Sequence, residues 1–283
     1  MAGERHRRWR IGTAPYLGAR PLDCGLADHP AVDLVTDVPS RLAERLDADE
    51  LDAALLPVID YFRLTADALE RHRHRPLAIV PGIAVTSRGP SNGVLLACRV
   101  DRAVVRHVAL DPAGHTSNCL VRLILKEVYG RKPHFRWPVP DPGEPDLESD
   151  AVLLVGDRAL VHDESDSYQT IDLGEAWDRH AGLPFVYAVW AVRESDGAGD
   201  VAAIVHEAKA RGLAARDELA RAGAARLGIA EDRARAYLRE NMRYDLGPDE
   251  VAGLQKFYRW AASEELAPLN IPIRLVGPAA GDA

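Results

Sequence analysis

The segment from residue 150 to residue 193 most constrains how this chain of 283 residues can fold. It begins with an uninterrupted apolar run over 151–155, which ends abruptly at Gly156-Asp157-Arg158. A continuous apolar run bounded by a turn signal is typical of a strand buried on both faces. In open α/β sheets, ligands bind beyond the carboxyl ends of such strands. We therefore expect Asp157 and Arg158 to lie near the edge of a sheet where a ligand binds.

The second part of this segment, residues 183–192, is rich in aromatic and β-branched residues and has almost no polar ones. Such a strand belongs in the middle of a sheet and not at its edge. Strand-like and helical runs alternate through the first two thirds of the chain, and after residue 194 the pattern is helical only. This order predicts an α/β fold with a largely parallel sheet, followed by helices over 200–223, over 231–242 and from 247–250 onward.

Composition and charge exclude several classes of protein. The net charge of −8 comes from 43 acidic and 35 basic residues, which argues against a surface for nucleic acid or for an anionic membrane. Apolar residues make up 47% of the chain, but no apolar run reaches the length of a membrane span. No apolar stretch follows the basic cluster at residues 4–10, so we expect no secretory signal.

The spacing of the cysteines and the absence of known cofactor motifs indicate where the protein is located and which cofactors to expect. Cys24, Cys98 and Cys119 are odd in number, far apart and without the spacing of metal ligands. This pattern favours buried thiols in a reducing cytoplasm over disulfides or a metal site. The chain has no HExxH or CxxC motif, no Walker loop and no dinucleotide glycine fingerprint, so we expect neither a metal nor a nucleotide cofactor. The expected location is the cytoplasm.

Polar or glycine-rich breaks follow several of the expected strands, and in a parallel α/β architecture such loops meet at one rim. They fall at residues 16–18, 57–58, 86–89, 111–117 and 156–158.

The strongest candidate for an anion site is Gly114-His115-Thr116-Ser117, which precedes a helix expected to run to residue 128. Free backbone N–H groups at a helix start bind carboxylates well. The alternative is that Thr116 or Ser117 merely caps the helix. Two roles also remain open for His115: a general acid or base near neutral pH, or a plain hydrogen-bonding loop residue.

Two further candidates flank the same rim. Tyr16 follows the first expected strand and either presents its hydroxyl to a ligand or simply packs. Asp157 either faces the ligand or forms an internal ion pair with Arg158, which is the commoner fate of such neighbours.

Several segments together resemble one known family, the menaquinone-biosynthesis chorismate dehydratases, which are the first enzymes of the futalosine route. The resemblance covers nearly the whole chain after about residue 9, and no single motif carries it. The segments are IGTAPYLGARPL, LDAALLPVIDYF, PGIAVTSRGP, ALDPAGHTS, VGDRAL, DLGEAW, GLPFVYAVWAV and YLRENMRYDLGPDEVAGLQKFY.

This resemblance implies a two-lobed α/β fold like that of the type 2 periplasmic binding proteins, with a ligand cleft between the lobes. We place lobe one at residues 1–92 together with 194–283, and lobe two at residues 93–193. The long apolar strands near 94–100 and 185–192 are then expected to be the hinge crossings, about which the cleft closes.

The resemblance also implies an activity: dehydration of chorismate to 3-[(1-carboxyvinyl)oxy]benzoate, with no metal or redox cofactor. The protein must hold two carboxylates, take up one proton and help hydroxide to leave. We assign carboxylate binding to Thr116, Ser117 and the loop at Ser87.

Three residues are candidates for orientation or proton transfer: Tyr16, His115 and Asp157. The family more often has arginine where His115 stands, so an anion clamp is weaker here. The substrate's own carboxylate is a further candidate for the base, because the rim offers few ionisable groups.

Two positions depart from the family's pattern. Where the family usually has a substrate-facing asparagine this chain has Gly18, and where it usually has a pocket serine this chain has Gly93. Losing both side chains removes polar contacts and is expected to enlarge the cleft. Ser91 or Asn92, beside Gly93, is a candidate replacement. The alternative is therefore a non-catalytic or re-purposed paralogue that binds a small carboxylate. A third possibility is an enzyme that acts on a bulkier carboxylate, for which the two glycines make room.

Overall fold

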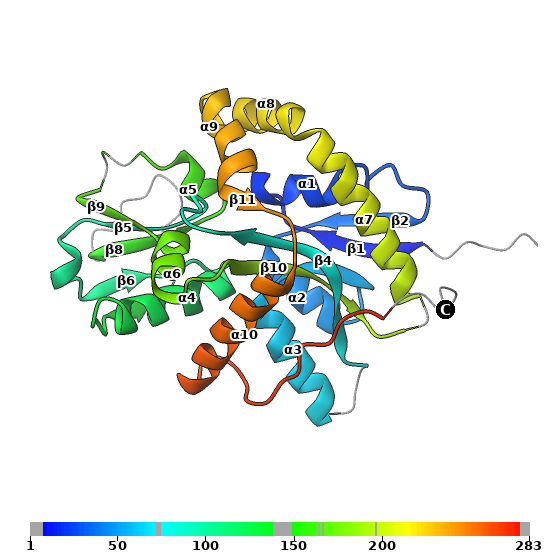
Figure 1. Cartoon of the computed structure of the whole chain (residues 1–283), viewed down its shortest axis with the longest axis horizontal. Helices are drawn as coiled ribbons and strands as arrows, with labels where there is room; N and C mark the ends of the chain where they lie inside the picture. The colour runs from blue at the N-terminus through cyan, green and yellow to red at the C-terminus, as the bar shows by residue number, and fades with distance from the viewer. Residues whose placement is uncertain are drawn as a thin grey trace, which may run out of the picture.

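Two β-sheets with helices packed around them make up the protein in the computed structural model (Figure 1). The structure describes residues 8–71, 75–137, 149–163, 165, 167–195 and 197–277, so the basic cluster at 4–10 lies largely outside it.

The first sheet contains six strands within the described residues, in the order β11-β4-β10-β3-β1-β2. Strands β1 and β2 are parallel, as are β1 and β3, whereas β10 is antiparallel to both β3 and β4, and β11 to β4. The strands are β1 (Trp9–Thr13), β2 (Val32–Thr36), β3 (Ala53–Pro57), β4 (Leu77–Ser87), β10 (Phe185–Arg193) and β11 (Met242–Arg243).

The apolar strand β10 lies in the interior of this sheet, as its composition predicts. Most of its side chains are buried, and its neighbours β3 and β4 are equally apolar. The expectation of a largely parallel sheet is wrong, because β10 brings the chain back from the second sheet and pairs in the opposite direction.

The second sheet contains five strands within the described residues, in the order β7-β6-β8-β5-β9. Its strands are β5 (Val94–Cys98), β6 (His107–Ala109), β7 (His134–Arg136), β8 (Ala151–Val155) and β9 (Gln169–Asp172). The apolar run of β8 pairs with β5 on one side and β6 on the other, so it is an interior strand, and Ala151, Leu153 and Leu154 in it are buried.

The chain passes between the sheets twice, first after β4 and then after β9. Both β5 and β10 pair within a single sheet along their described length, so neither strand runs from one sheet into the other. The passages instead fall beside them, at residues 88–93 and 173–184. The division into lobes at residues 93 and 193, and a hinge near these strands, remain predictions.

The helices follow the predicted order with two local differences. The helix expected over 200–223 is two helices, because Ala215 has φ −92° and ψ 12° and interrupts it. The helix expected over 231–242 ends in the π-helical turn η4 (Tyr237–Asn241). Besides η4, the described helical elements are η1 (Leu17–Ala19), α1 (Arg20–Asp23), α2 (Pro39–Asp47), α3 (Val58–Arg71), η2 (Arg102–Val104), α4 (His115–Glu127), α5 (Asp157–Val161), α6 (Leu173–Ala181), α7 (Ala198–Ala214), α8 (Arg216–Leu227), α9 (Glu231–Ala236) and α10 (Pro248–Ser263).

None of the described helices is both long enough and apolar enough to cross a membrane. The described residues also contain no group of three or more histidine, cysteine or acidic side chains placed to hold a metal ion.

Candidate active site

A cavity lies between the two sheets, and we call it the inter-sheet cavity. It encloses about 690 Å³ of empty space, including the part open to solvent. Its lining comes from η1, β3, β4, β10 and η4 on the first sheet's side and from β5, β8 and the start of α4 on the second sheet's side. The expectation that separate loops meet at one rim is confirmed for the segments at 16–18, 57–58, 111–117 and 156–158, each of which contributes lining residues.

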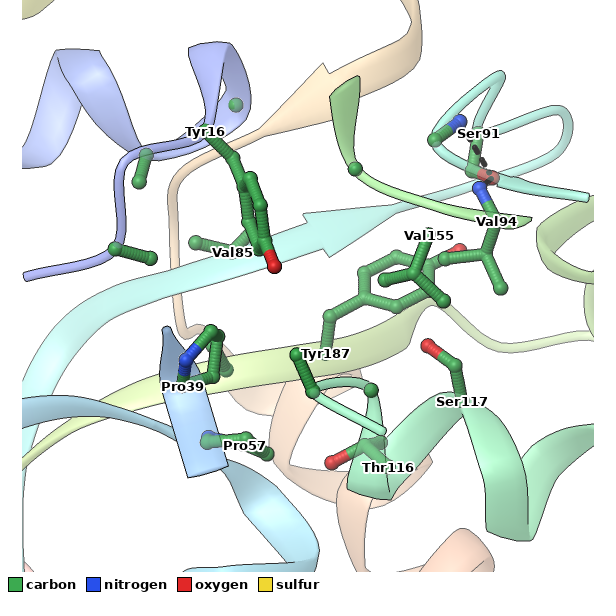
Figure 2. Close-up of a pocket in the computed structure, with 18 of the residues that line it drawn as sticks. Tyr16, Pro39, Pro57, Val85, Ser91, Val94, Thr116, Ser117, Val155 and Tyr187 are labelled. Atoms are coloured by element: carbon green, nitrogen blue, oxygen red, sulfur yellow. Dashed lines mark hydrogen bonds between the residues drawn. The ribbon is translucent and has the colours of Figure 1, made fainter. Parts of the chain in front are cut away.

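The lining is mostly apolar and carries several hydroxyl groups. Val85, Val94 and Val155 form part of the apolar surface in Figure 2. The described lining residues include no lysine, arginine, histidine, aspartate or glutamate. Polar chemistry in the cavity therefore falls to hydroxyls and to backbone N–H groups. The hydroxyl-bearing lining residues are Tyr16, Ser91, Thr116, Ser117, Tyr187 and Tyr237.

The start of α4 faces this cavity. Thr116 and Ser117 are buried and line it, as expected from the sequence (Figure 2). Neither side chain caps the helix: the N-cap is Gly114, and the first intrahelical bond runs from Asn118 N–H to the Gly114 carbonyl. The Thr116 Oγ1 instead accepts a hydrogen bond from the Ile59 N–H at 3.3 Å. The first N–H groups of the helix are left without intrahelical partners, which favours an anion in the cavity.

Tyr16 places its ring across the cavity, with the hydroxyl directed inward in Figure 2. The ring packs against Gly156, where a Cβ would lie 3.0 Å from the tyrosine Cγ. Burial, followed by the charges of Asp111 and Asp157, raises the pKa of Tyr16 to about 12. The phenol is therefore a hydrogen-bond donor at neutral pH and not a base.

Ser87 does not line the cavity but supports a residue that does. Its Oγ lies 2.9 Å from the Tyr187 hydroxyl, and both residues are buried. Burial raises the pKa of Tyr187 above its ordinary value, with the Asp172 charge as the second cause. Sequence reasoning missed Tyr187, and the one available signal was a hydroxyl-bearing residue within the apolar strand β10.

His115 and Asp157 also lie outside the cavity lining. The His115 Nδ1 is 2.9 Å from both carboxylate oxygens of Asp60. Asp157 accepts hydrogen bonds from the Leu17 N–H at 2.8 Å and from the Arg226 guanidinium at 2.7 Å. His115 and Asp157 therefore each link an element of the second sheet's side to an element of the first sheet's side. Both residues tether the two sides at the margin of the cavity.

The alternative in which Asp157 pairs with Arg158 is wrong. Arg158 instead lies 3.2 Å from a carboxylate oxygen of Asp111, whose pKa is raised chiefly by burial. Asp157 therefore contacts residues of the first sheet's side, whereas Arg158 contacts Asp111 on the second sheet's side.

Gly18 and Gly93 both line the cavity, as expected. Of the two candidate replacements for the missing side chains, Ser91 also lines it, but its Oγ lies within 3.3 Å of the Asp172 carboxylate and accepts from the N–H groups of Gly93 and Val94. The other candidate, Asn92, is not a lining residue: its amide donates to the Asn241 side chain at 2.9 Å.

The space in front of the two glycines is also not empty. A Cβ at Gly18 would lie 2.6 Å from the Tyr237 Oη, and a Cβ at Gly93 would lie 2.8 Å from it. The expectation that the glycines enlarge the cleft is therefore wrong at this point, because a tyrosine occupies the space.

Comparison with known proteins decides the family. A family model described as menaquinone biosynthesis matches residues 9–263. The chain belongs to this family. Chorismate dehydratase of Thermus thermophilus is 30% identical over 94% of this chain and 99% of its own length. Chorismate dehydratase of Campylobacter jejuni is 24% identical over 63% of this chain and 65% of its own length.

Solved structures confirm the fold of this family member. A crystal structure of a protein from Archaeoglobus fulgidus has a TM-score of 0.68 at 19% identity and covers 93% of this chain and 99% of its own. The periplasmic aliphatic sulphonate binding protein of Escherichia coli has a TM-score of 0.65 at 16% identity, over 96% of this chain and 92% of its own. The fold is therefore that of the periplasmic binding proteins, as the resemblance implied.

Proposed function

We propose that this chain is a chorismate dehydratase, which converts chorismate to 3-[(1-carboxyvinyl)oxy]benzoate. The observation that carries the proposal is the lining of the inter-sheet cavity, where apolar walls combine with several hydroxyls and the start of α4, and where no described lining residue is charged. Membership of the menaquinone-biosynthesis family and the relative in Thermus thermophilus support the choice of substrate.

The two sides of the cavity suit different parts of this substrate. A carboxylate fits the start of α4, where the Thr116 and Ser117 side chains, the first N–H groups and the positive end of the helix dipole all favour negative charge. The six-membered ring fits the apolar surface formed by residues such as Val94 and Val155.

The reaction removes one water molecule from the substrate. The C3–H bond breaks and its electron pair forms the new C3–C4 double bond. The C4–O bond breaks, and the departing hydroxyl combines with a proton to leave as water. Formation of the aromatic ring supplies the driving force. Because the described lining holds no carboxylate, imidazole or amine, we assign the uptake of the C3 proton to a carboxylate of the substrate itself.

The protein's hydroxyls hold and polarise the substrate in this scheme. Tyr16 keeps the orienting role expected from the sequence, as a donor to a substrate oxygen. We assign His115 and Asp157 to positioning, since both are engaged by partners outside the cavity lining. Ser87 acts through Tyr187 rather than on the substrate.

Incubation of the purified protein with chorismate tests the proposal, with the aromatic product separated by chromatography. We expect stoichiometric conversion of chorismate. A matched reaction with Ser117→Ala is expected to be slower, whereas Ser263→Ala, on the exposed end of α10, is expected to match the unaltered chain. Absence of product, together with thermal stabilisation by a different carboxylate, contradicts the proposal.

The second candidate is a non-catalytic paralogue that binds a small carboxylate. Gly18 and Gly93 favour it, because neither provides a polar side chain to the cavity. Chorismate that raises the melting temperature but remains unconverted is the result that selects this candidate. A preference for a bulkier carboxylate loses its support, since the Tyr237 hydroxyl fills the space in front of both glycines.

A further inference from the structure

Tyr237 is a buried residue that lines the inter-sheet cavity. It begins the π-helical turn η4, directly after α9, and its side chain is only 3% exposed. The residue lines the inter-sheet cavity although it lies more than 100 positions beyond the end of α4. Short π-helical segments are rare and frequently occur at functional sites.

Two glycines from separate segments enclose its hydroxyl. The ideal Cβ positions of Gly18 and Gly93 lie 2.6 Å and 2.8 Å from the Tyr237 Oη, closer than side-chain carbons approach in folded proteins. Gly18 is in η1, on the first sheet's side, and Gly93 directly precedes β5, on the second sheet's side. A Cβ at either position meets this hydroxyl unless the Tyr237 side chain shifts, so the absence of a side chain at both glycines matches the placement of one tyrosine.

The hydroxyl itself is left for a ligand. No hydrogen bond joins the Tyr237 Oη to another residue within the described part of the chain, whereas the Tyr187 hydroxyl is held by Ser87. Burial raises the pKa of Tyr237 above its ordinary value, and the charge of Asp157 adds to this effect. A phenol in that position stays protonated and donates. Because this donor opens onto the cavity, it is available to a ligand that offers an oxygen acceptor.

We propose that Tyr237 contacts the substrate directly, by donating a hydrogen bond to one of its oxygens, and that Gly18 and Gly93 are small in order to admit this hydroxyl. This inference rests on the proposed function for the identity of the substrate. One phenol on η4 then supplies the polar contact that neither glycine can make. A substrate carboxylate and the departing hydroxyl are both oxygen acceptors, and kinetics separate the two.

The first test is Tyr237→Phe, which keeps the buried ring and removes the hydroxyl alone. We expect kcat/KM for chorismate to fall roughly 10- to 100-fold. A fall carried by KM identifies a carboxylate as the acceptor, and a fall carried by kcat identifies the departing hydroxyl. The matched control is Tyr244→Phe, because the Tyr244 hydroxyl is buried without a partner but does not line the cavity. Its kcat/KM is expected to change less than twofold. Unchanged kinetics of Tyr237→Phe overturn the inference.

Failure of the proposed function gives a different result. If the unaltered chain does not convert chorismate, calorimetric titration with 3-hydroxybenzoate tests the inference. This probe is an aromatic carboxylate with a hydroxyl group on its ring. A dissociation constant at least tenfold weaker for Tyr237→Phe supports the contact. Equal binding by the two proteins, or binding by neither, overturns it.

A second measurement tests the enclosure without any ligand. Gly18→Ala is expected to lower the melting temperature by several degrees in the unaltered chain, because the new Cβ meets the hydroxyl. In the Tyr237→Phe background the next ring atoms lie 3.4 and 3.6 Å from that Cβ, which is ordinary contact, so most of the loss is expected to disappear. Equal losses in both backgrounds show that the glycine and the hydroxyl are not coupled and overturn this part of the inference.

Discussion

The two sides of the inter-sheet cavity present different kinds of polar group. The second sheet's side presents the short hydroxyls of Thr116 and Ser117 and backbone N–H groups, gathered in the first turn of α4. The first sheet's side presents phenols on long side chains: Tyr16 directly precedes η1, Tyr187 lies on β10 and Tyr237 on η4. A short segment can hold a carboxylate through local geometry, whereas phenols from distant segments meet only in the folded chain. The difference separates binding, assigned to α4, from orientation and polarisation, assigned to the tyrosines.

Removing the hydroxyls of the α4 side is expected to have the largest effect. The double variant Thr116→Val with Ser117→Ala loses two donors to a charged group, each worth about 1.5–3 kcal/mol. We expect kcat/KM for chorismate to fall roughly 100- to 10,000-fold, mainly through KM, in steady-state kinetics. A fall confined to kcat breaks the division between binding and orientation, since it places α4 in the chemical step.

The pH dependence of stability tests the environment of Asp23, which lies close to η1 on the first sheet's side of the cavity. Asp23, in α1 next to η1, accepts a hydrogen bond from Thr13 and pairs with Arg20, yet burial raises its pKa to about 6. Between pH 4 and 6 the folded chain holds a proton that the unfolded chain has lost, so this group makes stability fall as pH rises. We expect Asp23→Asn to gain about 2–3 kcal/mol relative to the unaltered chain between pH 4 and pH 7, measured by urea unfolding. A constant difference across that range refutes the raised pKa.

Among the phenols, Tyr187 is expected to show an intermediate effect. Tyr187→Phe removes one donor from the cavity and is expected to lower kcat roughly 10- to 50-fold. Ser87→Ala leaves the phenol in place without its partner and is expected to cost a few-fold. Tyr168→Phe, on an exposed residue outside the cavity lining, is the control and should leave kcat unchanged. If Ser87→Ala lowers kcat as much as Tyr187→Phe does, the phenol depends entirely on the serine and the expected few-fold cost is wrong.

The smallest effect expected is a flat pH profile. Because burial raises the pKa of Tyr16 to about 12, the phenol keeps its proton well above the ordinary value near 10. We expect no loss of kcat/KM through this group between pH 7 and pH 10, and Tyr16→Phe should have a profile of the same shape at lower activity. A loss between pH 8 and 10 that vanishes in Tyr16→Phe contradicts the donor role.

Contiguous features of the sequence predicted the same parts of the molecule well. The apolar runs of β8 and β10 indicated interior strands, and the Gly-His-Thr-Ser segment indicated the start of α4 in the cavity. In each case the relevant residues are neighbours in the chain, so local pattern carries the information. The break at Ala215 falls within an alanine-rich run three residues after Gly212, and the helical pattern of the sequence continues across it.

Features that depend on distant partners could not be predicted. Tyr237 reaches the space beside Gly18 only because the chain crosses between the sheets twice, and no local pattern reports that meeting. His115 is engaged by Asp60, and Asp157 by Arg226, so these ionisable groups leave the cavity for tethering contacts. The antiparallel direction of β10 likewise depends on where the chain returns from the second sheet.

The position of β10 also sets an order on synthesis of the chain. This strand lies between β3 and β4 in the first sheet, yet the ribosome makes it only after all five described strands of the second sheet. While the second half is emerging, β3 and β4 have no strand between them. The first sheet gains β10 only when residue 193 has been made and β11 only at residue 243, whereas the inserted second sheet has all its described strands by residue 172. The half of the cavity that carries α4 is therefore available to fold before the half that carries the tyrosines.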